Sequence, residues 1–223
     1  MLENPKIWIV IPVYNQPERL LATVEKAQKY GTVVVVDDCS LVPVNLGQLK
    51  NVFLLRHVIN RGQGAALQTG TDFAVEKGAD IVVHLDADGQ HNPDEIPRII
   101  EPLISERVDI VFGSRFIDQA NVQVPWTKKW FIHRPAIYFH NLWFGSNLTD
   151  VHNGFRALSV LACEKIKITQ DRFAHPTQIL EQVIKHELKY VEASIVVSYY
   201  GYGQNFFDGF KIITDMLIRW LSK

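Results

Sequence analysis

The sequence predicts an α/β fold in which a mainly parallel β-sheet is flanked by helices. Through the first half of the chain, short apolar runs alternate with amphipathic segments, as in consecutive βαβ units. A polar cluster follows each apolar run, and ligands of such sheets bind beyond the carboxyl ends of the strands. With 223 residues, 47% of them apolar, the chain can bury the core of one large domain.

Each expected element of the first half has its own sequence signal. The run IWIVIP gives the first strand, and Pro17 suits the first turn of the helix after it. The run TVVVV is β-branched and apolar throughout, which is typical of a strand covered on both faces. Gly78 ends the second helix, and Pro93 begins the third. The expected elements are strands at 6–12, 32–36, 52–57, 79–85 and 108–113, and helices at 17–30, 64–77 and 93–106.

The second half of the chain gives a weaker signal, because the regular alternation stops at about Asp118. A late strand is expected at 191–200 and an amphipathic helix at 206–221. Residues 123–148 are rich in Trp, Phe and Tyr, with Lys, Arg and His between them.

Charge and cysteine content exclude several classes of protein. With 23 basic and 24 acidic residues, the net charge of −1 argues against a nucleic-acid binder. Cys39 and Cys163 lie far apart without a pairing pattern, so we expect a reduced, cytoplasmic setting. We expect no signal peptide, because Glu3 and Pro5 interrupt the start, and no membrane-spanning segment.

Polar residues follow all five strands of the first half, as PVYNQ, DDCS, NRGQG, DADGQ and GSRF. Because the carboxyl ends of parallel strands meet at one edge of a sheet, these clusters should converge on one crevice.

The cluster DADGQ places Asp86, Asp88 and Gln90 at the exit of one strand. Alone, such a segment is more often a turn with hydrogen bonds from its Asp side chains. At the mouth of an α/β crevice we favour a divalent cation, because Mg²⁺ takes one or two protein carboxylates and fills its remaining positions with water and substrate phosphate.

The neighbouring clusters suit a nucleotide. Asp38 ends a strand with a carboxylate that can accept from base N–H groups or ribose hydroxyls, and Pro12, Tyr14 and Asn15 can flank a base or ribose. The loop before Gly64 opens a helix whose N-terminal amides favour an anion. By itself this loop is a weak signal, since its glycine spacing matches neither the GxGxxG motif nor the P-loop.

The motifs IPVYNQ, VVVVDDCS, NRGQGAALQTG, HLDADGQH, FGSRF and DVHNGFRALS, in this order and spacing, resemble family 2 glycosyltransferases of the GT-A fold. The most similar subgroup is the dolichol-phosphate mannosyltransferase and polyprenyl-phosphate glycosyltransferase type. The resemblance covers about residues 7–159. It implies one Rossmann-like GT-A domain over 1–223, with a nucleotide-sugar-binding half at 1–117 and an acceptor and membrane-interface half at 118–223.

The resemblance also implies an activity, the inverting transfer of a hexose from a UDP- or GDP-sugar to polyprenyl phosphate for cell-surface glycan synthesis. In such an enzyme Mg²⁺ or Mn²⁺ neutralises the diphosphate that leaves from an oxocarbenium-like transition state. The residues that would bind the nucleotide-sugar are Pro12, Tyr14, Asn15, Asp38, Gly64, Asp86 and Asp88. Asp86, Asp88 and Gln90 would bind the metal.

A phosphate acceptor would need cations rather than a general base, because a phosphomonoester is largely ionised at pH 7. Arg115, in GSRF, and Arg134 are the candidates, with Arg156 as a third. Together with Asp88, Arg115 and Arg134 form the expected catalytic set.

Two aromatic segments suggest contact with a membrane surface. The stretch WTKKWFIHRPAIYFHNLWF and the helix expected at 206–221 place bulky apolar residues beside cationic ones, as interfacial helices do. For the second segment, ordinary packing on the core is at least as good an explanation. We expect peripheral association with the cytoplasmic face of a membrane, with or without a small membrane protein as partner.

The chain departs from the family pattern at a few positions, and other functions stay open. Gln16 and Gln63 stand where the family usually has Glu and Lys, which leaves the donor in doubt. Transfer to a glycan hydroxyl would require a base, for which Asp150, Asp171 and Glu192 are candidates. A sugar-1-phosphate nucleotidyltransferase is less favoured, because PVYNQ lacks glycine. An inactive sugar-nucleotide-binding scaffold subunit is the alternative outside enzymes.

Overall fold

The computed structural model describes residues 4–15, 17–117, 148–150, 153–170 and 175–198. Gln16, Arg134 and Asp171 lie outside these residues, as do both aromatic segments, the stretch WTKKWFIHRPAIYFHNLWF and the helix expected at 206–221. Within the described part of the chain, one seven-stranded sheet has the order β3-β2-β1-β4-β6-β5-β7.

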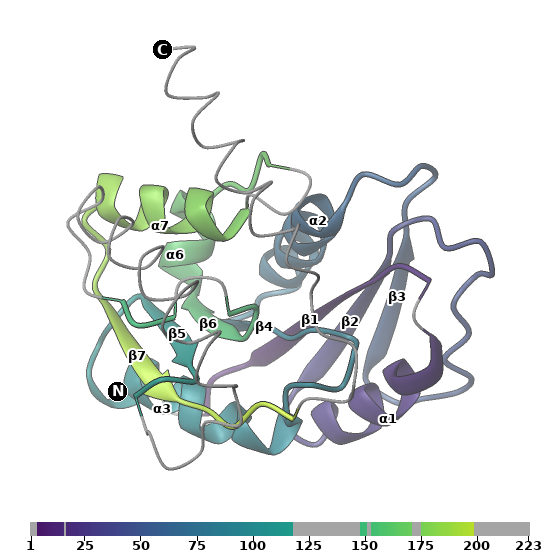
Figure 1. Cartoon of the computed structure of the whole chain (residues 1–223), viewed down its shortest axis with the longest axis horizontal. Helices are drawn as coiled ribbons and strands as arrows, with labels where there is room; N and C mark the ends of the chain where they lie inside the picture. The colour runs from purple at the N-terminus through teal and green to yellow at the C-terminus, as the bar shows by residue number, and fades with distance from the viewer. Residues whose placement is uncertain (1–3, 16, 118–147, 151–152, 171–174, 199–223) are drawn as a thin grey trace, which may run out of the picture.

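Helices cover both faces of this sheet (Figure 1), with α2, α6 and α7 on one face and α1 and α3 on the other. The strands are β1 Ile7–Val13, β2 Thr32–Asp37, β3 Val52–Arg56, β4 Ile81–His84, β5 Ile110–Ser114, β6 Arg156–Ser159 and β7 Tyr190–Ser194. The helices are α1 Pro17–Ala27, α2 Gln63–Glu76, the 3₁₀ turn η1 Pro93–Glu95, α3 Ile96–Ser105, α6 Val160–Lys165 and α7 His175–Lys185.

The predicted α/β class with a mainly parallel sheet is confirmed. All five strands expected in the first half are present, and they pair in parallel wherever they pair with one another. The exception to parallel pairing in the described sheet is β6, which is antiparallel to both β4 and β5 and lies between them.

Sequence analysis did not predict β6, α6 and α7, which follow the point at about Asp118 where the regular alternation was expected to stop. The strand β6 has only four residues, RALS, and starts with an arginine, so no period-2 pattern marks it. The helix α7 did carry a signal, because Ile179, Leu180 and Val183 recur at helical spacing and all three are fully buried.

Alternating residues of the strands build two apolar cores, one on each face of the sheet. Ile9, Val33 and Val83 pack with side chains of α1 and α3. Their neighbours Val10 and Val34 point to the opposite face and pack with α2, α6 and α7. This alternation is the period of two of a β-strand. A continuous apolar run such as TVVVV therefore supplies apolar side chains to the cores on both faces of the sheet.

Proline is unusual in a central strand because it lacks the backbone N–H that the ladder needs. Pro12 pairs with Val36 of β2, but β4 pairs with β1 only as far as Val10. The missing N–H of Pro12 falls on the side of β4, beyond the end of that pairing. The proline therefore lies where the sheet opens, next to the polar residues that follow β1.

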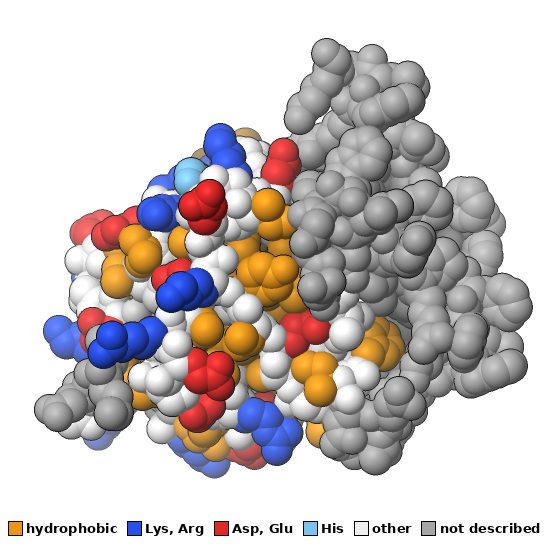
Figure 2. Space-filling model, turned by 90° about the vertical axis from the view of Figure 1, so that its left-hand side faces the viewer, with side chains coloured by type: hydrophobic (Ala, Val, Ile, Leu, Met, Phe, Trp, Pro, Cys, Tyr) orange, Lys and Arg blue, Asp and Glu red, His pale blue; other side chains and the backbone are white. Residues whose placement is uncertain are grey.

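Figure 2 shows the face that lies at the left of Figure 1, where charged side chains of both signs alternate with hydrophobic ones. No single sign of charge dominates this face, in keeping with a net charge of −1. Of the helices in the described ranges, none has the length and apolar character needed to cross a membrane.

Candidate active site

The polar residues predicted to converge do lie at the carboxyl ends of neighbouring strands. Tyr14 and Asn15 follow β1, Asp38 follows β2, and Asp86 follows β4. Arg115 follows β5, which is separated from β4 by β6. Because β6 runs the other way, the turn before it reaches the same edge.

Three segments of the chain meet at the Asp86 carboxylate, which is 26% exposed. Gln63, the first residue of α2, donates from Nε2 to Asp86 Oδ1 over 2.7 Å. His91 Nδ1 lies 3.5 Å from Asp86 Oδ2. Gly154, in the turn before β6, brings its Cα against the carboxylate so closely that a Cβ there would clash.

Asp88 is partly buried, and one oxygen of its carboxylate accepts from the backbone N–H of Gln90 over 2.9 Å. Burial raises the pKa of Asp88, and the negative charge of Asp86 raises it further. The Gln90 hydrogen bond and the charges of His91 and Arg19 offset only part of this rise. The charge of Asp86 thus disfavours the ionised form of Asp88, which is the electrostatic situation that a bound cation relieves.

The residues present fit a divalent metal whose coordination is completed by substrate. Within the described ranges, no group of three or more His, Cys, Asp and Glu side chains is placed to hold a metal ion. Asp86 and Asp88 offer two carboxylates, which suffice for Mg²⁺ or Mn²⁺ when a diphosphate and water fill the other positions. The assignment of Asp86, Asp88 and Gln90 as metal ligands stays a prediction.

Asp38 is buried and has a local structural role. Its Oδ1 accepts from His57 Nδ1 over 2.7 Å and from the Arg61 backbone N–H over 2.9 Å. Its Oδ2 accepts from the Gly62 backbone N–H over 2.6 Å. Gly62 has φ of +102°, so glycine suits this position. The amides just before α2, where an anion was expected, thus bind the Asp38 carboxylate in this structure.

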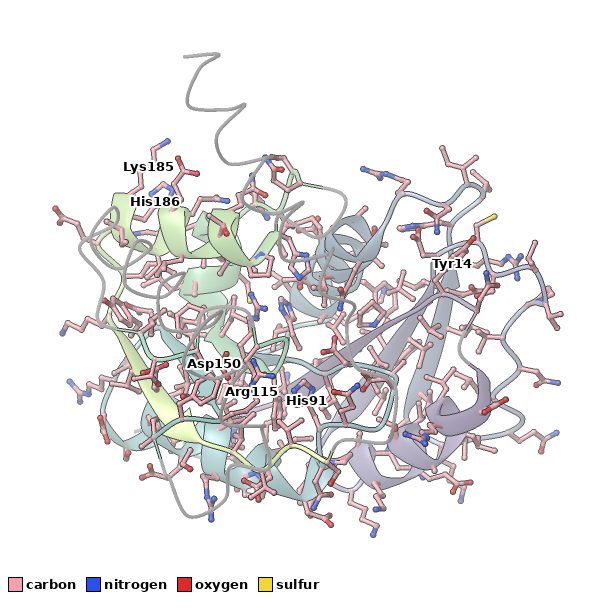
Figure 3. The ribbon with its side chains drawn as sticks, in the orientation of Figure 1. Tyr14, His91, Arg115, Asp150, Lys185 and His186 are labelled. Atoms are coloured by element: carbon pink, nitrogen blue, oxygen red, sulfur yellow. The ribbon has the colours of Figure 1, made fainter. Side chains whose placement is uncertain are left out.

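The other nucleotide-binding candidates differ in exposure. Tyr14 is 48% exposed and lies at the end of β1 (Figure 3). Asn15 Oδ1 accepts from the Leu41 backbone N–H over 2.9 Å, which ties the end of β1 to the loop after β2. Pro12 is buried within β1, and Gly64 is buried where α2 approaches the backbone of Gln170.

Arg115 forms a bidentate ion pair with Asp150. Its Nε donates to Asp150 Oδ2 over 2.6 Å and its Nη2 donates to Oδ1 over 2.9 Å. The Arg115 side chain is 21% exposed and that of Asp150 only 3%. Both residues are labelled in Figure 3. The arginine expected to meet the acceptor phosphate is thus held by a buried carboxylate, with part of its surface open to solvent.

Two of the three candidates for a general base already have structural partners. Asp150 is paired with Arg115. Glu192, on β7, accepts from the backbone N–H groups of Thr149 over 2.8 Å and Asp150 over 3.0 Å. Burial raises the pKa of Glu192 and the charge of Asp150 adds to this, while the hydrogen bonds from Thr149 and Asp150 lower it in part. The third candidate, Asp171, lies outside the described residues.

Arg156, considered as a third acceptor cation, is completely buried. Its Nη2 donates to the Asn153 carbonyl over 2.9 Å, and burial lowers its pKa to about 10, with the charge of Asp86 opposing the shift. Arg156 therefore braces the turn before β6 and does not face solvent.

Sequence reasoning missed His91 and Gly154. Both stand in motifs that had been singled out, DADGQH and NGFR. Their position next to the motif residues could have pointed to them. Their contacts with Asp86, however, can be seen only in the folded structure.

Comparison with protein families gives a match over residues 8–167 to the model described as glycosyl transferase family 2. A UDP-N-acetylglucosamine–dolichyl-phosphate N-acetylglucosaminyltransferase of Methanococcus voltae is 30% identical, covering 97% of this chain and 97% of its own. An undecaprenyl-phosphate mannosyltransferase of Micrococcus luteus is 31% identical, covering 68% of this chain and 65% of its own.

The fold is also that of a solved glycosyltransferase structure. Glucosyl-3-phosphoglycerate synthase from Mycobacterium tuberculosis, in complex with Mn²⁺, UDP and glucosyl-3-phosphoglycerate, superposes with a TM-score of 0.73. The match covers 97% of this chain and 80% of that one, at 14% identity, so it speaks for the fold alone. With the family match and the relatives above, the chain belongs to glycosyl transferase family 2 and is a glycosyltransferase of the GT-A fold.

Proposed function

We propose that this glycosyltransferase uses Mg²⁺ or Mn²⁺ to transfer a hexose, with inversion, from a UDP- or GDP-sugar to polyprenyl phosphate for cell-surface glycan synthesis. The observation that carries the proposal is the Asp86–Asp88 pair at the exit of β4, where burial and mutual repulsion raise the pKa of Asp88. A bound cation carrying the donor's diphosphate compensates both charges.

The donor would lie along the carboxyl ends of β1, β2 and β4. Tyr14 is exposed at this edge and can pack against the base or ribose. Asp38 keeps the loop before α2 in place through Arg61 and Gly62, so the first turn of α2 faces the donor with a fixed backbone. Asn15, Pro12 and Gly64 complete the set that we propose for the nucleotide-sugar.

The chemistry requires the bond between the anomeric carbon and the diphosphate to break as an acceptor oxygen attacks the opposite face of the sugar. A divalent cation supplies charge neutralisation for the leaving diphosphate. Asp86 and Asp88 would hold it, with Gln90. Arg115, preorganised by Asp150, would orient the acceptor together with Arg134.

A phosphate acceptor is favoured over a glycan hydroxyl because a phosphate needs no general base. Asp150 and Glu192 are engaged by a guanidinium and by backbone amides, so neither is poised to take a proton from a hydroxyl. Relatives named as dolichyl-phosphate and undecaprenyl-phosphate transferases support the same acceptor class.

We further propose peripheral attachment to the cytoplasmic face of the membrane, where such a lipid phosphate is accessible.

The test is thermal unfolding of the full chain with UDP or GDP, each with and without Mn²⁺, for the parent and Asp88→Ala. A ligand at 100 times its Kd stabilises by about 2.7 kcal/mol, or an increase in Tm of roughly 5–10 °C at this chain length. We expect one nucleotide to raise Tm only when Mn²⁺ is present, and Asp88→Ala to lose this increase. If neither nucleotide raises Tm in the presence of Mn²⁺, the proposed donor and metal site is wrong.

A further inference from the structure

We propose that Gly154 is a positioning residue that fixes where the Asp86 carboxylate lies, and through it the affinity for the metal-bound nucleotide. The effect on nucleotide affinity rests on the proposed function. The effect on the position of the Asp86 carboxylate rests only on contacts within the chain.

The reason for glycine at position 154 is steric rather than conformational. Gly62 and Gly89 have positive φ, whereas Gly154 does not, so no left-handed backbone requires a glycine there. A Cβ at Gly154, however, would lie 2.8 Å from Cγ and 2.9 Å from Oδ1 of Asp86, and closer still to Oδ2. Contacts below 3.0 Å are essentially never made by Cβ atoms, so one of the two groups would have to move.

The turn that carries Gly154 is held from several sides and cannot easily move. Asn153 Oδ1 accepts from the Phe155 backbone N–H over 2.9 Å, which spans the glycine. Arg156 Nη2 donates to the Asn153 carbonyl over 2.9 Å, and the Gly113 backbone N–H donates to the Phe155 carbonyl over 2.9 Å. The side chains of Phe155 and Arg156 are fully buried, so shifting this backbone would disturb the core.

The Asp86 side chain can yield, because its carboxylate turns about two single bonds and is partly exposed. Its strongest described contact is the 2.7 Å hydrogen bond from Gln63 Nε2. An alanine at Gly154 would therefore displace the carboxylate, break this hydrogen bond and change the spacing of the Asp86 oxygens from Asp88. Gly154 thus leaves room for the Asp86 carboxylate in the orientation that accepts the hydrogen bond from Gln63.

The same turn also reaches the acceptor side of the site. Asn153 Nδ2 donates to Asp150 Oδ2 over 3.4 Å, and Asp150 holds Arg115. The ring of His91, which lies close to Asp86, packs 5.5 Å from that of Phe155, the residue after Gly154. The turn therefore contacts the proposed metal carboxylate through Gly154, and Asn153 links it to Asp150, which holds the proposed acceptor cation.

The geometric part is tested by a double-mutant cycle on the ligand-free chain, comparing the Tm of the parent, Gly154→Ala, Asp86→Ala and the double variant. We expect Gly154→Ala to lower Tm in the parent and to lower it less in the Asp86→Ala background, where the colliding atoms are gone. An equal loss in both backgrounds overturns the proposal, because the alanine would then be clashing with something other than Asp86.

The functional part is tested by calorimetric titration of Gly154→Ala with Mn²⁺ and whichever of UDP or GDP stabilises the parent. Displacing a metal-orienting group weakens affinity by about tenfold or more, and we expect such a loss. The control is Val183→Ala in α7, which lowers stability through the core without touching the site and should keep the affinity of the parent.

Affinity unchanged by Gly154→Ala, or reduced equally by Val183→Ala, overturns the functional part. If the parent binds neither nucleotide, the proposed function fails. The ligand-free cycle then decides alone whether Gly154 positions Asp86.

Discussion

Among single residues, Asp37 and Asp38 show how adjacent carboxylates can do different structural work. Asp37 is fully buried at the end of β2, where it accepts from the Ser40 backbone N–H over 2.9 Å and from Arg56 Nη1 over 2.9 Å. Burial alone would raise the pKa of Asp37, but the hydrogen bonds from Ser40 and Val44 and the charge of Arg56 together lower it. Asp38 instead holds the loop before α2. Neither structural role could be predicted from the sequence Asp37–Asp38 alone.

Asp37→Asn should lower the free energy of unfolding at pH 7 by about 1–3 kcal/mol, because it leaves buried hydrogen-bond partners unsatisfied. The folded pKa of Asp37 lies below its ordinary value of 3.8, so its ionised form stabilises the fold above that pH. This contribution is lost as pH falls through the folded pKa. Urea unfolding at pH 7, 5 and 3 should therefore show the gap between parent and variant closing below pH 3.8.

The control is Asp72→Asn, at an exposed ion pair with Lys167, which should change stability by less than about 1 kcal/mol. A gap for Asp37→Asn that stays constant from pH 7 to pH 3 would contradict the assigned role of its ionised form.

Arg115→Lys should reduce kcat/KM for the proposed acceptor, polyprenyl phosphate, by about 100-fold, the usual size of effect for one lost preorganised donor. A lysine cannot make both contacts to Asp150, so its cation would not be held in one place. Steady-state kinetics with each substrate varied would check this, with the KM for the donor unchanged. Arg98→Lys, at an exposed arginine on α3, is the matched control and should behave as the parent does.

Among the helices and strands, prediction from the sequence succeeded for the continuous apolar runs of the first half. It failed for β6, a strand whose formation depends on pairing with strands distant in the sequence. The strand at 32–36 was recognisable because a threonine followed by four valines is a β-branched run typical of a buried strand. The strand β6 was not, because RALS becomes a strand only when β4 and β5 lie on either side of it. For the same reason, the strand-end position of Asp86 was foreseeable, and its contact with Gly154 was not.

Leu180→Ala in α7 should lower the free energy of unfolding by about 2–5 kcal/mol, because Leu180 is fully buried in the core beneath this helix. Leu161→Ala in α6, where the side chain is 43% exposed, should cost within about 0.5 kcal/mol. Denaturant titration of both variants measures the difference. Equal small effects would mean that α7 does not pack on the sheet as described.

For the whole molecule, we propose that 1–117 carries the donor site and 118–223 the acceptor and membrane interface, while both halves build one sheet. The strand β6, from the second half, lies between β4 and β5 of the first. The strand β7, also from the second half, extends the sheet beyond β5. A functional division into halves therefore does not imply that either half can fold alone.

A fragment of residues 1–117 should not unfold cooperatively, because it leaves both β4 and β5 without the strand that joins them. Its circular dichroism should change gradually on heating, while the full chain gives a sharp transition. A sharp transition for the fragment would show that the first half is an independent folding unit.

The place of β6 in the sheet also has a consequence for how the protein is made. On the ribosome, β4 and β5 leave the exit tunnel well before the residues that will join them. At about 5–20 residues per second, translation needs several seconds to supply β6. During that interval the nascent chain presents one unpaired edge of β4 and both edges of β5, which is when a chaperone would be needed most.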